Sequence, residues 1–208
     1  MAPWAAAYGN LIRTREDLAR YAALARHAAR LGGDDARTLA MAGTAVLYLE
    51  QDFDFGEALV GRAIGRNPNE YVAWICAGWI SVQRGRRAEA FERFAQAERL
   101  NPLAYAQDGI HAGRALACFF DESLDEAEAH VARALQNQPE SPSALSTAVA
   151  IAARRGDQAR LEQRRSDLLK LYPEGLDAFA IKTLPFATPD LRARFFSALA
   201  LGGIPGRI

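Results

Sequence analysis

The fold of this chain is decided in residues 71–102, YVAWICAGWISVQRGRRAEAFERFAQAERLNP. Small side chains at Ala77 and Gly78 let two helices approach closely, and Phe94 fills the space beside small residues on the second helix. Gly85 marks a turn between the two helical segments. The stretch therefore predicts one helical hairpin. Such a hairpin cannot bury both of its apolar faces alone, so it needs neighbours of the same kind.

Prolines recur along the chain at intervals that fit such neighbours. Pro68, Pro102, Pro139 and Pro173 are separated by 34, 37 and 34 residues, and each follows an apolar helical segment. Because proline cannot continue a helix, each one marks the end of a hairpin. About five hairpins of this period would account for nearly the whole chain.

The order of aromatic, small, small, Ala, Phe, Ala and Pro residues in 71–102, at a period near 34, resembles the tetratricopeptide repeat. The resemblance implies an all-α, right-handed α-solenoid of about five helix hairpins with a terminal capping helix. It implies one superhelical domain over 1–208. The imperfect repeats are expected at about 3–36, 37–70, 71–104, 108–141 and 142–175, with C-terminal helices in 175–202.

Local patterns predict individual helices outside the central unit. They are expected at 3–12, 15–31, 36–50, about 55–66, 111–120, 158–171, about 175–184 and 189–201, with another opening at the cap Ser141-Pro142. The segment 55–66 contains three glycines that each cost about 1 kcal/mol relative to Ala, so we expect a soft helix there. Thr188 precedes the last helix, which should cover the apolar edge of the final repeat.

Composition excludes several classes of function. The chain has 25 basic and 25 acidic residues, so it offers no net field to attract a nucleic acid. Half of its residues are hydrophobic, and the sequence shows neither a secretory signal nor an apolar run long enough to span a membrane. A cytoplasmic protein is expected.

The abundance of Arg and Ala over Lys indicates the coding bias of a GC-rich bacterium.

No residue pattern indicates catalysis, a cofactor or a metal, so the chain is not expected to be an enzyme. His27, His111 and His130 have no Cys, Asp or Glu partners at a spacing typical of zinc sites. Cys76 and Cys118 fall in apolar helical patterns, where reduced buried thiols are expected.

Two charge clusters have structural explanations. The acidic cluster around 121–128 lies at a helix start, where the helix dipole stabilises carboxylates without a cation. The arginines between 154 and 165 alternate with acidic residues and predict a salt-bridged outer face rather than a phosphate-binding one.

In tetratricopeptide proteins the first helix of each pair lines the concave side, which implies a groove in this chain. Ten of the inward positions carry large apolar side chains: Met41, Tyr48, Leu49, Val72, Ile75, Trp79, Val82, Leu116, Phe119 and Phe120. The Lys, Arg and Asn residues with which one branch of the family holds a C-terminal carboxylate are missing from the first three repeats. An apolar groove favours a helix laid into it. The alternative is that these side chains contact neighbouring repeats or the protein's own terminal segments.

The sequence therefore predicts a non-catalytic scaffold that binds a partner helix or peptide in an apolar concave groove, with a homodimer as another form of association. A second hypothesis comes from 73–79, 114–120 and the ending LPFATPDLRARFFSALALGGIPG, 184–206. These segments resemble the C-terminal repeats of bacterial class III nucleotide cyclases and winged-helix transcriptional regulators. That resemblance implies a regulatory, sensor or dimerisation domain. A third hypothesis is a helical small-ligand binder or enzyme that uses His111 or His130.

Overall fold

The computed structural model describes residues 15–31, 33, 35–102, 107–171 and 185–204, and all regular secondary structure in these residues is α-helical. The helices are α2 (Arg15–Leu31), α3 (Ala36–Glu50), α4 (Phe53–Arg66), α5 (Tyr71–Gln83), α6 (Arg87–Leu100), α7 (Gln107–Phe120), α8 (Leu124–Asn137), α9 (Pro142–Arg155), α10 (Gln158–Leu171) and α12 (Pro189–Leu201). The helices predicted at 3–12 and 175–184 lie outside the described residues.

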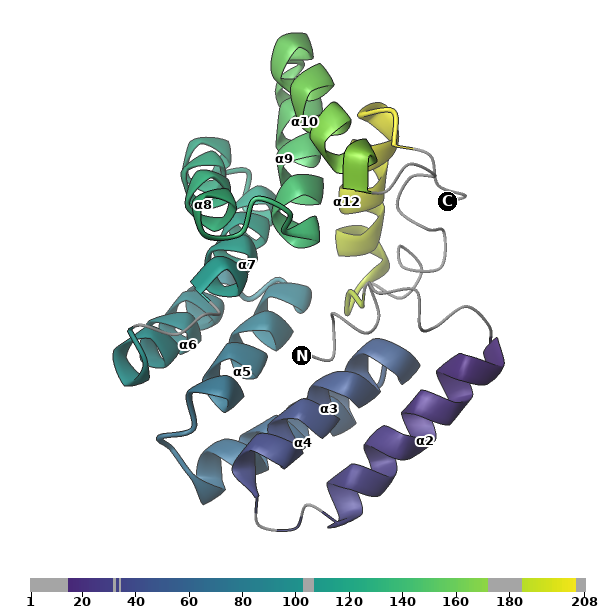
Figure 1. The fold of residues 1–208 in the computed structure, drawn as a ribbon, viewed down its shortest axis with the longest axis vertical. Coiled ribbons are helices and arrows are strands. Elements are labelled where there is room, and N and C mark those ends of the chain that lie inside the picture. The colour runs from purple at the N-terminus through teal and green to yellow at the C-terminus, as the bar shows by residue number, and fades with distance from the viewer. Residues whose placement is uncertain (1–14, 32, 34, 103–106, 172–184, 205–208) are drawn as a thin grey trace.

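Consecutive helices pack as antiparallel hairpins, α3 with α4, α5 with α6, α7 with α8, and α9 with α10. The first helices of these hairpins, α3, α5, α7 and α9, also pack in series, so the hairpins form a curved stack (Figure 1). α12 lies on the inner side of this curve, against α9 and α7. We call the side of α3, α5, α7 and α9 that faces α12 the inner face. The predicted all-α solenoid is confirmed.

Glycines let α3 and α4, the two helices of the first complete hairpin, approach closely. A Cβ atom added to Gly43 of α3 would lie 2.8 Å from the carbonyl oxygen of Gly56 of α4, and the reverse distance is also 2.8 Å. The backbones therefore touch, and Gly56 is a contact residue rather than a source of softness. Gly61 and Gly65 have no atom within 4 Å of an added Cβ, so only these two carry the cost in helix propensity without a packing gain.

Glycine occupies two of the four turns between paired helices, whereas Gln51 and Glu122 adopt a positive φ of 57° at the other two. Gly85 and Gly156 both adopt left-handed backbone conformations, with φ of 70° and 68°, which only glycine adopts without strain. The Oγ1 atom of Thr188 accepts a hydrogen bond from the N–H of Leu191 at 3.3 Å, as a cap of α12 should. Ser141 is the N-cap residue of α9, as predicted, but its side chain makes no capping hydrogen bond. Pro142 itself supplies the helix start there.

The buried apolar residues form two clusters along the stack. One joins α5 through α10 to α12 and contains Phe94, and the other joins α2, α3, α4 and α5 and contains Leu39 and Leu47. Phe94 packs where Gly78 of α5 and Gly113 of α7 leave room for its ring. Each hairpin thus buries its faces against the next one, as a solenoid requires.

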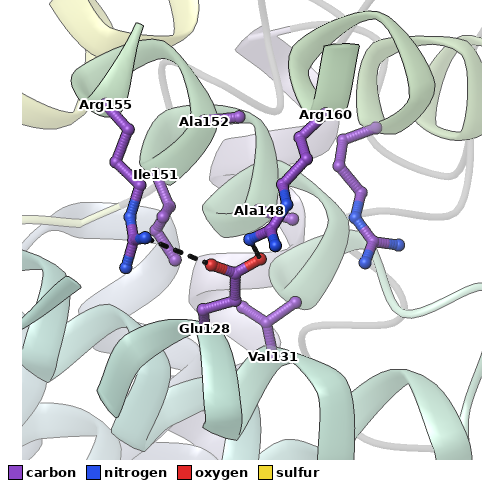
Figure 2. Close-up of a pocket in the computed structure, with 8 residues that line it drawn as sticks. Glu128, Val131, Ala148, Ile151, Ala152, Arg155 and Arg160 are labelled. Carbon is purple, nitrogen blue, oxygen red and sulfur yellow. Dashed lines mark hydrogen bonds and ion pairs between the residues drawn. The ribbon is translucent and has the colours of Figure 1, made fainter. Parts of the chain in front are cut away.

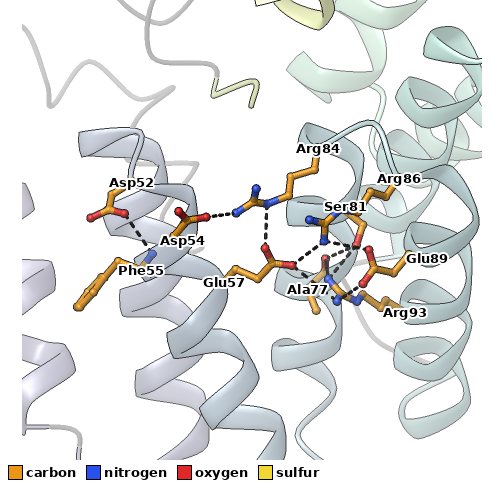
Figure 3. A network of polar contacts seen from close by, with 10 residues as sticks. All are labelled: Asp52, Asp54, Phe55, Glu57, Ala77, Ser81, Arg84, Arg86, Glu89 and Arg93. Atoms are coloured by element: carbon orange, nitrogen blue, oxygen red, sulfur yellow. Dashed lines mark hydrogen bonds and ion pairs between the residues drawn. The ribbon is translucent and has the colours of Figure 1, made fainter. Parts of the chain in front are cut away.

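Ion pairs connect successive hairpins on the outside. Arg84 pairs with Asp54 at 2.7 Å and Arg86 with Glu57 at 3.0 Å (Figure 3). The arginines at the end of α9 do the same with the hairpin before them, since Arg154 pairs with Glu122 at 2.8 Å. Exposed pairs each contribute at most about 1 kcal/mol, so their main effect is on the register of neighbouring hairpins.

None of the helices in the described residues combines the length and the apolarity that a bilayer span requires.

Candidate functional site

Most of the side chains predicted to line the groove are buried within the chain. Seven of the ten are buried, namely Tyr48, Ile75, Trp79, Val82, Leu116, Phe119 and Phe120. The other three, Met41, Leu49 and Val72, are half-buried. The predicted residues therefore divide into a large buried set and a small set that solvent reaches.

Trp79 belongs to the packing between hairpins. Its ring meets the ring of Phe94 edge-on at a centroid distance of 6.4 Å. It also lies against α7, because a Cβ added to Gly113 would be 3.4 Å from the indole. Trp79 is 9% exposed, so a partner could reach only its rim.

Phe119 and Phe120 are covered by the C-terminal segment. The ring of Phe195 lies 6.0 Å from that of Phe119, and the ring of Phe186 lies 5.5 Å from that of Phe120. Arg194 donates to the carbonyl oxygen of Phe120 at 2.7 Å. At this end the inner face already holds an apolar helix, which is the chain's own α12.

The same segment reaches the end of α5. The N–H of Ala187 donates to the carbonyl oxygen of Gln83 at 2.9 Å, and the Nε2 of Gln83 donates to the hydroxyl of Tyr48 at 2.8 Å. The Oε1 atom of Gln83 is buried and has no hydrogen-bond partner among the residues described. Two hydrogen bonds thus connect Tyr48 on α3, Gln83 at the end of α5 and the segment that leads into α12.

Three of the predicted groove side chains lie outside the fully buried sets. Met41 and Leu49 are not members of either core cluster formed by the described residues, and Val72 packs at the edge of one of them.

A second cluster lies within the hairpin of α7 and α8 and was missed by spacing rules. The Nδ1 atoms of His111 and His130 are 3.2 Å apart, and their rings stack with centroids 5.4 Å apart. On the other side of the ring, the Nε2 of His130 lies 4.0 Å from Oε1 of Glu126. The ligand atoms of Cys118, Glu126 and His130 all lie within 4.8 Å of one another.

The sequence contains part of the signal for this cluster. Glu126 and His130 are four residues apart and therefore share a face of α8. Cys118 comes from α7, across the hairpin turn, and its position against α8 depends on the tertiary packing.

Burial sets the protonation of this cluster. Removal from water lowers the pKa of His130 to about 4, helped by the neighbouring His111, and burial also lowers the pKa of His111. Burial raises the pKa of the Cys118 thiol to about 12. Both imidazoles are therefore neutral at pH 7, and one Nδ1–H donates to the other ring's Nδ1.

A cavity between α8, α9 and α10 is too small for a ligand. Glu128 lies between Arg155 and Arg160, with Val131 and Ile151 on its apolar side (Figure 2). The cavity has a volume of about 10 Å³, which is room for one water molecule at most. Arg155 and Arg160 are paired here with Asp125, Glu128 and Asp157, so the salt bridges join this face mainly to α8 rather than forming within the segment 154–165.

Comparison with known proteins supports the fold at the level of architecture. No protein-family model and no curated protein matches the chain. Among solved structures, TTC0263, a thermophilic TPR protein from Thermus thermophilus, superposes with a TM-score of 0.60 at 22% identity, over 89% of this chain and 93% of that one. MamA, solved as the RS-1 ArsTM double mutant, gives a TM-score of 0.56 at 17% identity, over 76% of this chain and 87% of that one. The fold is therefore that of tetratricopeptide-repeat proteins.

The identities are low enough that these likenesses establish the fold alone. Neither of these two proteins is described as a cyclase or a winged-helix regulator, so the finer resemblance of the C-terminal ending stays a prediction.

Proposed function

We propose that this protein is a non-catalytic interaction scaffold that binds an amphipathic helix of a partner protein on the inner face of α3 and α5, beside α12. The fold supports a scaffold because stacked hairpins present a continuous curved surface on which an extended partner can lie. The site is narrower than the ten residues predicted from the sequence, because α12 and the core use most of them.

α12 is the observation that supports this proposal most strongly. It is an apolar helix on the inner face, held by Phe186 and Phe195 on the rings of Phe119 and Phe120. The face is therefore suited in shape and chemistry to a helix. A partner helix would extend the same mode of packing to α3 and α5, where Met41, Leu49 and Val72 are half-buried.

The chemistry of these side chains defines the partner. Methionine adapts to irregular apolar surfaces, and Leu and Val accept aliphatic side chains spaced one helical turn apart. The chain carries 25 basic and 25 acidic residues, so long-range attraction contributes little. We expect binding that changes little with salt concentration.

We also propose a cytoplasmic location. Cys76 and Cys118 are free and buried, which suits a reducing compartment.

The partner can be identified by photo-crosslinking in the native cell. A photoreactive phenylalanine at Met41 should capture a protein through a helical segment, whereas the same group at Glu92, exposed on α6, should not. A peptide of the captured segment is then titrated into the purified protein. Met41→Glu with Leu49→Glu should weaken its binding at least about tenfold, because a buried charge replaces each apolar contact.

The matched control introduces the same charge elsewhere. Leu24→Glu changes an apolar side chain on α2 that is 53% exposed, and it should leave the peptide affinity unchanged. Equal crosslinking at Met41 and Glu92, or a captured segment that stays extended when bound, would overturn the proposal. A crosslinked product of twice the mass would identify the partner helix as one from a second copy of this chain.

A further inference from the structure

The hairpin of α7 and α8 brings together three side chains that are good ligands for a transition metal. Cys118 offers a thiol, Glu126 a carboxylate and His130 an imidazole, with all three ligand atoms within 4.8 Å of one another. Cys118 and His130 are buried, and the side chain of Glu126 is 43% exposed. Thiolate and imidazole ligands prefer zinc over magnesium or calcium, which prefer oxygen.

We propose that Cys118, Glu126 and His130 form a binding site for a single zinc ion between α7 and α8. This inference is independent of the proposed partner-binding face.

The geometry needs only a small contraction. Bond lengths of about 2.0–2.3 Å around a tetrahedral zinc ion place neighbouring ligand atoms about 3.3–3.8 Å apart. The Nε2 of His130 is 4.0 Å from Oε1 of Glu126, close to this range. Glu126 is partly exposed, which lets its carboxylate move toward a metal and leaves the fourth position open to water.

Groups behind the ligands hold them in the required orientation. The Nδ1 of His130 faces the Nδ1 of His111 at 3.2 Å, so a hydrogen on the Nδ1 of His130 leaves the Nε2 lone pair directed toward Glu126. The two oxygens of the Glu126 carboxylate have different neighbours: Oε2 pairs with Arg87, and Oε1 faces His130. Partners of this kind, which fix the tautomer and the carboxylate plane, accompany protein zinc ligands.

The charges around the site are compatible with a cation. Arg87, which contacts Glu126, is also paired with Asp121. Arg114 is paired with Glu98. When the metal binds, the Cys118 S–H bond breaks, its proton goes to solvent and the sulfur lone pair forms the Zn–S bond. Because metal binding releases this proton, the affinity should rise with pH.

Cobalt is the probe for the site, because Co²⁺ takes zinc's place and absorbs light. The full-length protein, freed of metal by chelation, is titrated with Co²⁺. We expect one ion per chain, a thiolate-to-cobalt charge-transfer band in the near ultraviolet, and loss of the band when Zn²⁺ is added. Cys118→Ser should abolish the band, while Cys76→Ser, at the chain's other buried free thiol, should keep it.

The remaining variants separate ligand from positioning roles. Glu126→Gln should weaken Co²⁺ binding at least about tenfold, whereas Glu128→Gln on the same helix should not change it. His111→Gln should weaken binding about 10- to 100-fold and keep the charge-transfer band, because it acts through His130. Circular dichroism verifies the fold of each variant, and Glu126→Gln, at an exposed position, tests the site even if a buried variant unfolds. Absence of Co²⁺ binding, or binding that Cys118→Ser leaves intact, would overturn the site.

Discussion

Gly78 and Gly113 contact the same ring from two different helices. A Cβ atom at Gly78 would lie 2.4 Å from a carbon of Phe94, and one at Gly113 would lie 2.5 Å from another. Phe94 is fully buried, so its ring cannot move aside easily. In the contact between the second and third complete hairpins, the ring of Phe94 therefore fills space that Gly78 and Gly113 leave because they have no side chain.

The first prediction concerns these glycines. Gly78→Ala should destabilise the protein by about 1–3 kcal/mol, because the new methyl group overpacks the site. Gly61→Ala is the control, since an added Cβ there meets no atom within 4 Å. It should stabilise the protein by about 0.5–1 kcal/mol through helix propensity. Urea denaturation measures both. A stabilising Gly78→Ala would show that close approach does not hold these helices together.

The second prediction concerns the C-terminal helix. Phe195 is 2% exposed and packs on Phe119 and Phe120, so Phe195→Ala should cost about 3–5 kcal/mol in free energy of unfolding. Leu201 lies on the same helix and is 72% exposed, so Leu201→Ala should change stability by less than about 0.5 kcal/mol. Equal effects of the two substitutions, measured by denaturant unfolding, would mean that α12 does not pack on the inner face.

The third prediction concerns pH. The pKa of His130 is lowered from 6.5 to about 4 in the folded protein, so the unfolded chain binds more protons between these values. Stability should therefore fall as pH drops through this window, by on the order of 2 kcal/mol. Burial is the main cause of the lowered pKa, His111, Arg114 and Arg133 add to it, and Glu126 opposes it.

The histidine contribution can be isolated by substitution. His130→Gln should reduce the dependence of the unfolding free energy on pH between 4 and 6.5, and His111, whose pKa is also lowered, should retain part of it. His27→Gln, at an exposed position on α2, should not. If the His130→Gln protein keeps the slope of the wild type, other groups account for the loss of stability in acid.

The fourth prediction concerns a partly buried ion pair. Arg114 donates from both terminal nitrogens to the two oxygens of Glu98, at 2.8 and 2.7 Å, and its side chain is only 11% exposed. Arg114→Gln should destabilise the protein by about 1–3 kcal/mol, because it leaves a carboxylate in a partly buried site without its partner. The pair of Lys170 and Asp167 is the comparison, since Lys170 is 70% exposed. Lys170→Gln should change stability by less than about 0.5 kcal/mol, and a double-mutant cycle for each pair gives the coupling directly.

The amino-acid pattern was sufficient to predict most helices. The segments 15–31, 36–50, 158–171 and 189–201 coincide with α2, α3, α10 and α12. Local signals control these bounds: a capping side chain, an apolar stripe of helical period, and a glycine or proline at the end. α7 begins at Gln107, four residues before the predicted start at His111, because the inserted residues after Pro102 carry no clear apolar stripe.

The sequence was a poorer guide to which side chains remain accessible. Periodicity placed Trp79 and Phe119 on the first helices, but it could not reveal that Phe94 and Phe195 lie against them. In the same way, Cys118 and His130 belong to different helices, so their proximity has no signature in sequence spacing.

By itself, the sequence of this protein determined a chain of helical hairpins, because helix formation depends on residues three or four positions apart and the small residues that let paired helices approach lie nearby in the sequence. Only the tertiary structure decided that α12 covers part of the inner face and that a thiol, a carboxylate and two imidazoles meet inside one hairpin. The position of α12 depends on how far each hairpin rotates against the next, which close packing around residues such as Phe94 and Gly113 sets. The cluster inside the hairpin depends on how α7 packs against α8.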